Sequence, residues 1–220
     1  MLTRELLTQT LPHLKLSDKI YQALQQMSDN NVTHLPVIED EKFIGLVSEN
    51  MLLNAEDDSA ELSELQHAFI KISVKENEHF LTVIQETVEN DLSLMPVVND
   101  ENELLGSVTK SELLKNASEF MSLNEPGGMI VLEMEPKQYS FNELSRLVEA
   151  NETQITQLNT SVDNLTGMLQ VTIKINKADV ADVVSSLQRH DYNVKYYFGE
   201  ELYENELRSN YDNLMNYLKI

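Results

Sequence analysis

The chain contains an internal repeat, which limits the folds open to it. Pro36 recurs as Pro96, and Gly45 recurs as Gly106 after a turn that is one residue longer. Around both pairs the order is a helix, a strand, a turn rich in acidic and amide residues, a second strand and a second helix. One such unit cannot cover both faces of its sheet, so we expect the two copies to pack together. The expected elements are 16–27, 32–38, 43–47 and 48–53 in the first copy and 80–88, 94–98, 104–108 and 109–114 in the second.

Apolar side chains at helical spacing predict the inner face of the first helix in each copy. The acidic, polar stretch 54–64 lies between the copies and is expected to connect them. The predicted inner faces are Ile20, Ala23, Leu24 and Met27 in the first copy and Phe80, Val83, Ile84 and Val88 in the second.

A different pattern follows the segment 123–128, where a proline and two glycines mark a domain boundary. We expect Gly127 and Gly128 to act as a hinge. The order beyond them is βαββαβ, which is the ferredoxin-like arrangement, and Ser140 with Glu143 fits a capping box at the first helix. A last amphipathic helix is expected over 201–219. The strands and helices of this second pattern are predicted at 129–134, 140–150, 154–158, 168–175, 179–189 and 193–198.

Composition restricts the partners and the chemistry. The chain has 220 residues, 16 basic and 37 acidic, for a formal net charge of −21. Such a surface repels phosphate backbones, which argues against nucleic acid as a partner. The absence of cysteine excludes disulfides, thiolate zinc sites and thiol catalysis. No apolar run approaches the roughly 20 residues of a membrane-spanning helix, and the N-terminus shows no apolar signal core. We therefore expect a cytoplasmic protein without a membrane partner.

The repeat resembles a pair of CBS domains, a tandem module that senses adenosine nucleotides. The resemblance rests on His-Leu-Pro-Val-Ile at 34–38 with Gly-Leu-Val-Ser at 45–48, and on Leu-Met-Pro-Val-Val at 94–98 with Gly-Ser-Val-Thr at 106–109. The second half resembles an ACT-type domain, and this order of domains is similar to the acetoin-utilisation regulatory family. The resemblance implies an α/β (α+β) protein with CBS repeats at 1–58 and 62–122, an ACT-like domain at 129–198 and a terminal helix at 200–220.

The resemblance also implies a ligand site. In CBS domains a hydroxyl residue and an aspartate three positions later hold the nucleotide, and the residues before the proline of the other repeat complete the site. Here the second repeat offers Thr109 and Glu112, whereas Met51 stands at the carboxylate position of the first. The implied ligand set is Thr109, Glu112, Thr33, His34, Lys110 and Lys15. An ordinary capping box also explains Thr109 and Glu112 with no ligand involved, and glutamate in place of the family's aspartate favours that explanation.

Two hypotheses follow. The first is a non-enzymatic sensor, acting as a homodimer, that binds AMP, magnesium-bound ATP or S-adenosylmethionine and signals to a partner protein. The second is a ligand-free scaffold used for assembly, favoured by Met51 and by the lack of a glycine in the ACT-like turn 135–139. Neither a catalytic motif nor a metal-binding motif is present in the sequence.

Overall fold

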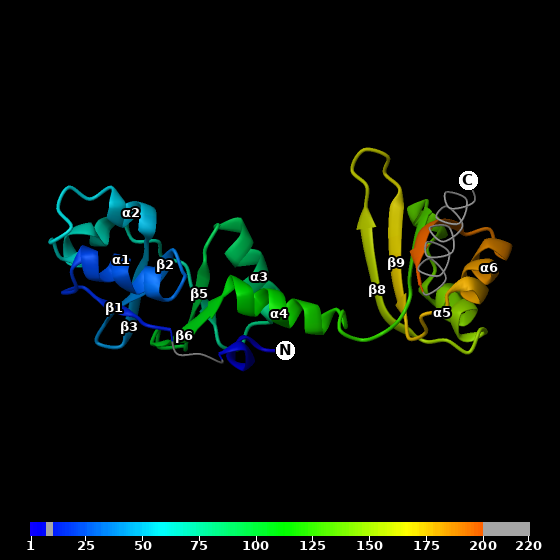
Figure 1. Cartoon of the computed structure of the whole chain (residues 1–220), viewed down its shortest axis with the longest axis horizontal. Helices are drawn as coiled ribbons and strands as arrows, with labels where there is room; N and C mark the ends of the chain where they lie inside the picture. Colours follow the sequence, from blue (N-terminus) through cyan, green and yellow to red (C-terminus); the bar gives the residue numbers. More distant parts are fainter. Residues whose placement is uncertain (8–10, 200–220) are drawn as a thin grey trace, which may run out of the picture. The chain divides into compact units, whose positions relative to one another are not determined.

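The computed structural model describes residues 1–7 and 11–199. The described residues form two compact units, which divide between Ala117 and Ser118 (Figure 1). The terminal helix predicted for 200–220 lies outside the described residues.

The first unit contains the predicted repeat. Each copy also has a two-residue strand that the sequence did not indicate: β1 (Leu14–Lys15) pairs in parallel with β2, and β4 (Val74–Lys75) pairs in parallel with β5. The two sheets therefore have the orders β1-β2-β3 and β4-β5-β6. The main elements are α1 (Ile20–Asp29), β2 (His34–Glu39), β3 (Lys42–Ser48) and α2 (Glu49–Leu53), then α3 (Phe80–Glu89), β5 (Leu94–Val98), β6 (Leu104–Thr109) and α4 (Lys110–Phe120).

A single hydrophobic core joins the two repeats. The predicted inner face of α1 is confirmed: Ile20, Ala23 and Met27 are buried, and Leu24 packs partly buried against the core. The predicted face of α3 is wrong at one position: Val88 is 68% exposed, whereas Thr87 is 1% exposed. Thr87 lies seven residues after Phe80, which places both on one helical face. Its hydroxyl donates to the Val83 carbonyl at 2.6 Å, so burial leaves it hydrogen-bonded.

Segments outside the repeated pattern supply hydrogen-bond acceptors to the N-terminus of the first helix of each copy. The Ile20 and Tyr21 amides donate to carbonyls of the acidic connection, at Ala60 (3.1 Å) and Asp58 (2.9 Å). The N-terminal segment does the same for α3, where the Phe80 amide donates to the Met1 carbonyl at 3.3 Å. These bonds satisfy helix N–H groups that have no partner inside the helix. The connection 54–64 thus also caps α1, and its last residues belong to a 3-10 helix, η2 (Leu62–Ala68).

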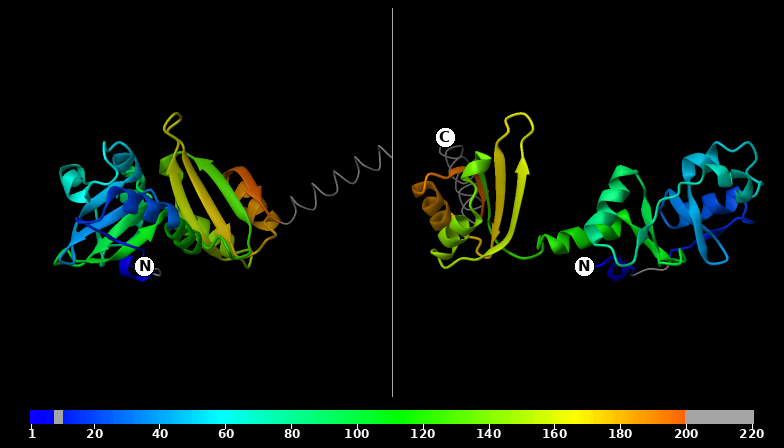
Figure 2. Two further views of the ribbon diagram at one scale, coloured as in Figure 1. Left: turned by 60° about the vertical axis from the view of Figure 1, so that its left-hand side comes forward. Right: turned by 180° about the vertical axis from the view of Figure 1, so that it is seen from behind.

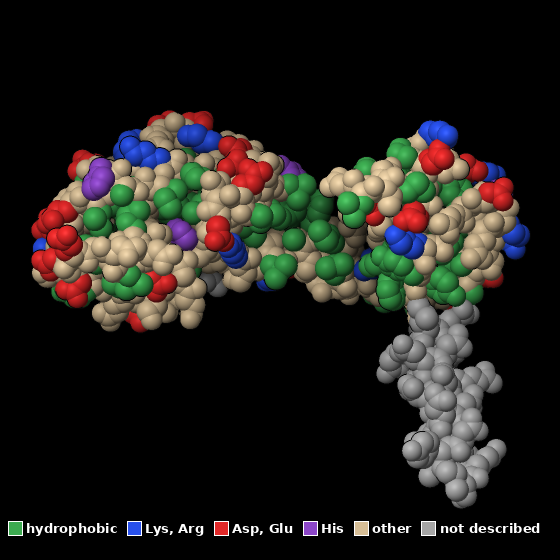
Figure 3. All heavy atoms as spheres, turned by 90° about the horizontal axis from the view of Figure 1, so that it is seen from above, with side chains coloured by type: hydrophobic (Ala, Val, Ile, Leu, Met, Phe, Trp, Pro, Cys, Tyr) green, Lys and Arg blue, Asp and Glu red, His purple; other side chains and the backbone are tan. Residues whose placement is uncertain are grey.

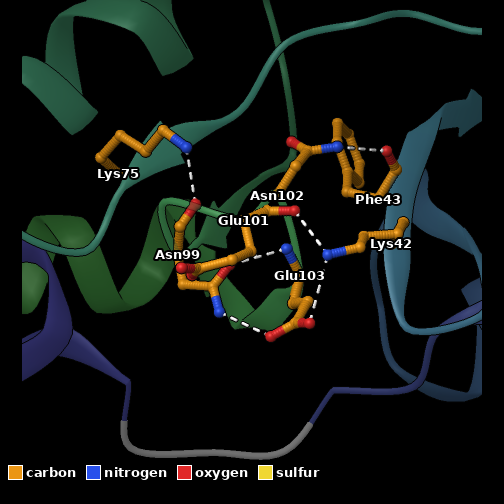
Figure 4. Close-up of polar contacts among 7 residues, drawn as sticks. All are labelled: Lys42, Phe43, Lys75, Asn99, Glu101, Asn102 and Glu103. Carbon is orange, nitrogen blue, oxygen red and sulfur yellow. Dashed lines mark hydrogen bonds and ion pairs between the residues drawn. The ribbon is translucent and has the colours of Figure 1, made fainter.

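The turns of the two hairpins are hydrogen-bonded to each other. The Phe43 amide donates to the Asn102 carbonyl at 2.9 Å, and the Leu104 amide donates to the Glu41 carbonyl at 3.1 Å. The Asn102 side chain donates back to the Phe43 carbonyl at 2.9 Å. Lys42 also reaches Glu103, at 3.2 Å (Figure 4). We call these contacts between 41–43 and 99–104 the turn joint.

The second unit has the predicted βαββαβ order. Its sheet has the order β10-β7-β9-β8 with antiparallel neighbours, and both helices lie on one face of it (Figure 2). Apolar residues from the helices and from that face of the sheet form a separate core. The elements are β7 (Met129–Met134), η3 (Pro136–Gln138), α5 (Phe141–Glu149), β8 (Ile155–Val162), β9 (Leu169–Ile175), α6 (Ala181–Arg189) and β10 (Asn193–Phe198). Ser140 caps α5 by accepting from the Glu143 amide at 3.4 Å.

The two glycines before β7 are fixed in place, and the hinge interpretation is wrong. The Gly128 amide donates to the Lys177 carbonyl at 2.7 Å, and its carbonyl accepts from the Ile175 amide at 3.0 Å. A Cβ at Gly127 would lie 1.9 Å from the Ile175 carbonyl oxygen. Gly127 is therefore required by a close approach of two backbones, which only a residue without a side chain allows. At Gly128 an added Cβ would lie 2.1 Å from Cγ1 of Val180.

We predict that Gly127→Ala destabilises the second unit by about 3 kcal/mol, because backbone must move to admit the methyl group. Gly167→Ala is the control: its Cβ would meet nothing within 4 Å, so only the left-handed conformation adds a cost, about 1 kcal/mol. Thermal unfolding followed by signals of the second unit measures both. Equal losses for the two variants would contradict the steric account.

Candidate functional site

The segments that precede the two repeated prolines meet in the first unit. The Thr33 amide donates to the Ser93 hydroxyl at 3.0 Å, and the Ser93 amide donates to Nδ1 of His34 at 3.2 Å. The Thr33 and Ser93 hydroxyls lie 3.1 and 3.2 Å from the same nitrogen. We call these contacts among Thr33, His34 and Ser93 the inter-repeat latch. They lie at the opposite end of β2 from the turn joint.

Each of these segments is also tied to the helix that ends its own repeat. The Glu49 amide, at the start of α2, donates to the Thr33 carbonyl at 2.8 Å, and the Lys110 amide, at the start of α4, donates to the Ser93 carbonyl at 3.1 Å. The first residues of α2 and α4 are thereby held beside the latch. Each helix begins directly after the hydroxyl residue, Ser48 or Thr109, that ends the glycine-containing strand.

A cleft of about 350 Å³ opens beside the latch and takes residues from both repeats. That volume lies within the range of small-molecule sites, about 300–1,000 Å³. We call it the inter-repeat cleft. Its lining consists of Thr33, His34, Ser48, Glu49, Asn50, Ile70, Asn90, Asp91 and Lys110.

Charges in the inter-repeat cleft largely cancel. Nζ of Lys110 lies 3.0 Å from Oδ1 of Asp91, and this bond together with the lysine charge lowers the pKa of the aspartate. The pKa of His34 is lowered mainly by burial, and the Lys110 charge adds to that effect while Asp91 opposes it. Glu49 adds a carboxylate to the wall. On the face of the molecule seen in Figure 3, acidic side chains lie at several separate places, with lysine and arginine side chains near some of them.

Thr109 and Glu112 form the capping box that the sequence allowed. The Glu112 amide donates to the Thr109 hydroxyl oxygen at 3.2 Å, and Oε2 of Glu112 accepts from the Thr109 amide at 2.8 Å and from its hydroxyl at 2.9 Å. Both members therefore satisfy backbone groups at the start of α4.

The structure divides the six predicted site residues among three places. Thr33, His34 and Lys110 line the inter-repeat cleft, and Thr109 and Glu112 form the cap of α4. Lys15 lines another hollow, of about 520 Å³, together with His13, Leu16, Ser17, Ile38, Glu39, Asp40 and Glu41.

The cleft also contains residues that sequence reasoning missed, above all Asn90 and Asp91. A signal for them exists in the repeat, since Asn30 and Asn31 precede the first strand as Asn90 and Asp91 precede the second. Asn31 and Asp91 both have positive φ, at 53° and 48°. Asparagine and aspartate tolerate this backbone conformation better than most residues. In the second copy the turn places Asp91 at the cleft.

Met51 occupies the position where the family has its carboxylate. It is partly buried and packs against the core of the first unit. The helix start before it is capped by Ser48, whose hydroxyl oxygen accepts from the Met51 amide at 3.2 Å. Within residues 1–7 and 11–199, no group of three or more His, Cys, Asp or Glu could hold a metal ion. No helix in the described part of the chain is long and apolar enough to cross a membrane.

We predict that Thr109→Ala lowers the free energy of unfolding of the first unit by about 1 kcal/mol, the usual cost of losing a helix cap. Thr109→Ser keeps the hydroxyl and should retain most of the stability. Denaturant unfolding followed by amide signals of α4 compares the two variants. Equal destabilisation by alanine and serine would show that the capping hydroxyl is not what stabilises this helix.

Comparison with known proteins places this unit in a family. The CBS domain family matches residues 4–58 and 70–119. A CBS domain-containing protein of Methanocaldococcus jannaschii is 26% identical over 116 residues, which are 52% of this chain and 94% of that protein. The inosine-5'-monophosphate dehydrogenase of the same archaeon is 22% identical over 134 residues, 60% of this chain. This chain spans only 27% of the dehydrogenase.

A solved structure gives the same answer for the fold. A CBS domain pair/ACT domain protein from Thermotoga maritima superimposes with a TM-score of 0.50 at 22% identity, covering 55% of this chain and 99% of the other. The repeat, its two sheets and the family match agree. The first unit of this chain is a pair of CBS domains.

Proposed function

We propose that this chain is a cytoplasmic, non-enzymatic regulatory protein whose CBS pair binds an adenosine-containing ligand in the inter-repeat cleft and signals to a partner protein. The observation that carries the proposal is the cleft itself, where polar side chains of both repeats converge around about 350 Å³. A ligand held there contacts both repeats at once, so its binding energy can favour one arrangement of the pair over another.

The groups around the cleft suit the parts of an adenosine ligand. Asn50 and Asn90 offer amide donors and acceptors, and Glu49 offers a carboxylate that can accept from ribose hydroxyls. Ile70 provides an apolar contact for a base. Lys110 is the cation for a phosphate or a carboxylate. Thr33 and His34, which belong to the latch, form one wall of the cleft.

The charges favour a ligand of modest negative charge. Asp91 already neutralises Lys110, and Glu49 leaves a carboxylate facing the same space. A free polyphosphate would meet these carboxylates without enough cations to balance them. AMP, S-adenosylmethionine and magnesium-bound ATP fit this balance better. The order of a CBS pair and a ferredoxin-like unit supports a relationship to the acetoin-utilisation regulatory family, and we extend the proposal to a homodimer on that resemblance.

A ligand-free scaffold is the second candidate, and Met51 favours it. The side chain at the family's carboxylate position packs into the core, and Glu112 is engaged in the cap of α4. In this alternative the CBS pair serves assembly alone, and the cleft stays without an adenosine ligand.

Thermal unfolding in the presence of AMP, ADP, ATP with and without magnesium, adenosine and S-adenosylmethionine tests the proposal. A ligand at 100 times its dissociation constant stabilises by about 2.7 kcal/mol, which raises the midpoint by about 5–10 °C. We expect such a rise for at least one member of the panel. No rise at millimolar concentrations would favour the scaffold.

Variants in the cleft sharpen the test, because the ion pair predicts opposite effects from its two partners. Lys110→Met should weaken an anionic ligand by about tenfold or more, whereas Asp91→Asn frees the lysine and should strengthen it. Lys115→Met, on the same helix and outside the cleft lining, controls for the loss of one positive charge. Equal effects of Lys110→Met and Lys115→Met would place the ligand elsewhere.

The same thermal-unfolding measurements with ligand test the role of Glu112. Glu112→Ala should abolish binding if the carboxylate contacts the ligand. Retained affinity together with a loss of about 1 kcal/mol in stability is the result expected from capping alone.

A further inference from the structure

We propose that the inter-repeat latch is proton-sensitive: it is closed when the His34 imidazole is neutral, and protonation of Nδ1 opens it. Ser93 and Thr33 are the groups released. The latch contacts join protein groups only, so this inference goes beyond the proposed function and is tested on the unliganded protein.

The contacts fix the protonation state of the closed latch. The Ser93 amide lies 3.2 Å from Nδ1 of His34 and can only donate. Nδ1 must therefore carry a lone pair, and the proton of the neutral ring resides on Nε2. The Thr33 and Ser93 hydroxyls near Nδ1 can rotate and act as donors or acceptors. The backbone amide has no such freedom, so it is the contact that protonation breaks.

The charges that face His34 do not prevent this response. Asp91 lies on the segment between α3 and β5, Lys110 begins α4, and Glu49 begins α2; all three line the same cleft as the imidazole. Lys110 disfavours an imidazolium and Asp91 favours one, and the two are paired at 3.0 Å. Burial is the larger influence and lowers the pKa of His34 below its ordinary value of 6.5.

The direction of the pH effect follows from this lowered pKa. As the pH falls below about 6.5, an opened or unfolded chain takes up a proton before the closed latch does. The stability that the latch contributes is therefore fully present above that pH. It is lost progressively as the pH falls through the lower pKa of the closed form. Acid opens the latch, and neutral pH closes it.

The consequence is a joint between the repeats that responds to mild acid at one end only. The turn joint at the other end depends mainly on backbone amides and carbonyls, as between Phe43 and Asn102, and these groups do not titrate. Its ion pair adds one carboxylate, Glu103, whose pKa is held below its ordinary value by the Asn99 side chain and by Lys42, so it stays charged in mild acid. Opening the latch would release the wall of the inter-repeat cleft while the two repeats stay joined. Where the cleft binds a ligand, as the proposed function states, affinity would then depend on pH.

Amide hydrogen exchange of the unliganded full chain tests the latch, in a series from about pH 7.5 to about pH 4.5 with correction for the intrinsic exchange rate. We expect the protection of the Ser93 and Thr33 amides to fall at least tenfold across the series. The Phe43 and Leu104 amides, which belong to the turn joint, should keep theirs and serve as the internal control.

His34→Asn is the matched variant, because its side-chain oxygen can accept from the Ser93 amide and does not titrate in this range. We expect it to keep the Ser93 amide protected at both ends of the series. An NMR titration of His34 in the wild-type chain gives a second readout, with a midpoint below 6.5 expected. Unchanged Ser93 protection in the wild-type chain would overturn the proposal, as would the same acid loss in His34→Asn.

Discussion

Hydrogen bonding between the two CBS repeats is the constraint on which the rest of the first unit depends. A three-stranded sheet with two short helices cannot bury its apolar side chains alone, and the two copies here share one core. The turn joint fixes one end of this assembly through backbone bonds of Phe43 and Leu104. The inter-repeat latch fixes the other end through Ser93 and His34. A change in either joint therefore changes how the repeats meet.

The position of the cleft follows from these joints. Because Glu49 and Lys110 donate their amides to the carbonyls of Thr33 and Ser93, the helix starts α2 and α4 are drawn to the latch. The first residues of both helices therefore line the inter-repeat cleft. Lys110 pairs with Asp91 there, so the lysine charge is already neutralised, and Glu49 adds a further carboxylate to the lining. In the proposed complex, an anionic group of the ligand would compete with Asp91 for Lys110.

The sequence predicted the repeat, the order of elements and the βαββαβ unit, because apolar periodicity and turn residues are local signals. The strand 193–198 was placed with the bounds that the structure gives β10. Long-range contacts leave no such signal. The two-residue strands β1 and β4 exist only through their partners. Thr87 is buried in place of Val88 because it shares the helical face of Phe80 and Val83, and its hydroxyl bond to the Val83 carbonyl satisfies the buried polar group. Lys15 lines a different hollow from the inter-repeat cleft, and its position there depends on tertiary packing.

NMR chemical-shift mapping of the labelled chain with AMP tests ligand binding in the inter-repeat cleft most directly, since it locates a ligand without assuming where it binds. If AMP binds in the inter-repeat cleft, we expect chemical-shift changes concentrated at the residues that line it: Thr33, His34, 48–50, Asn90, Asp91 and Lys110. Shifts centred on the hollow that contains Lys15, or on the second unit, would contradict the assignment of the inter-repeat cleft. An unchanged spectrum at saturating AMP, repeated with S-adenosylmethionine and magnesium-bound ATP, would contradict adenosine sensing itself.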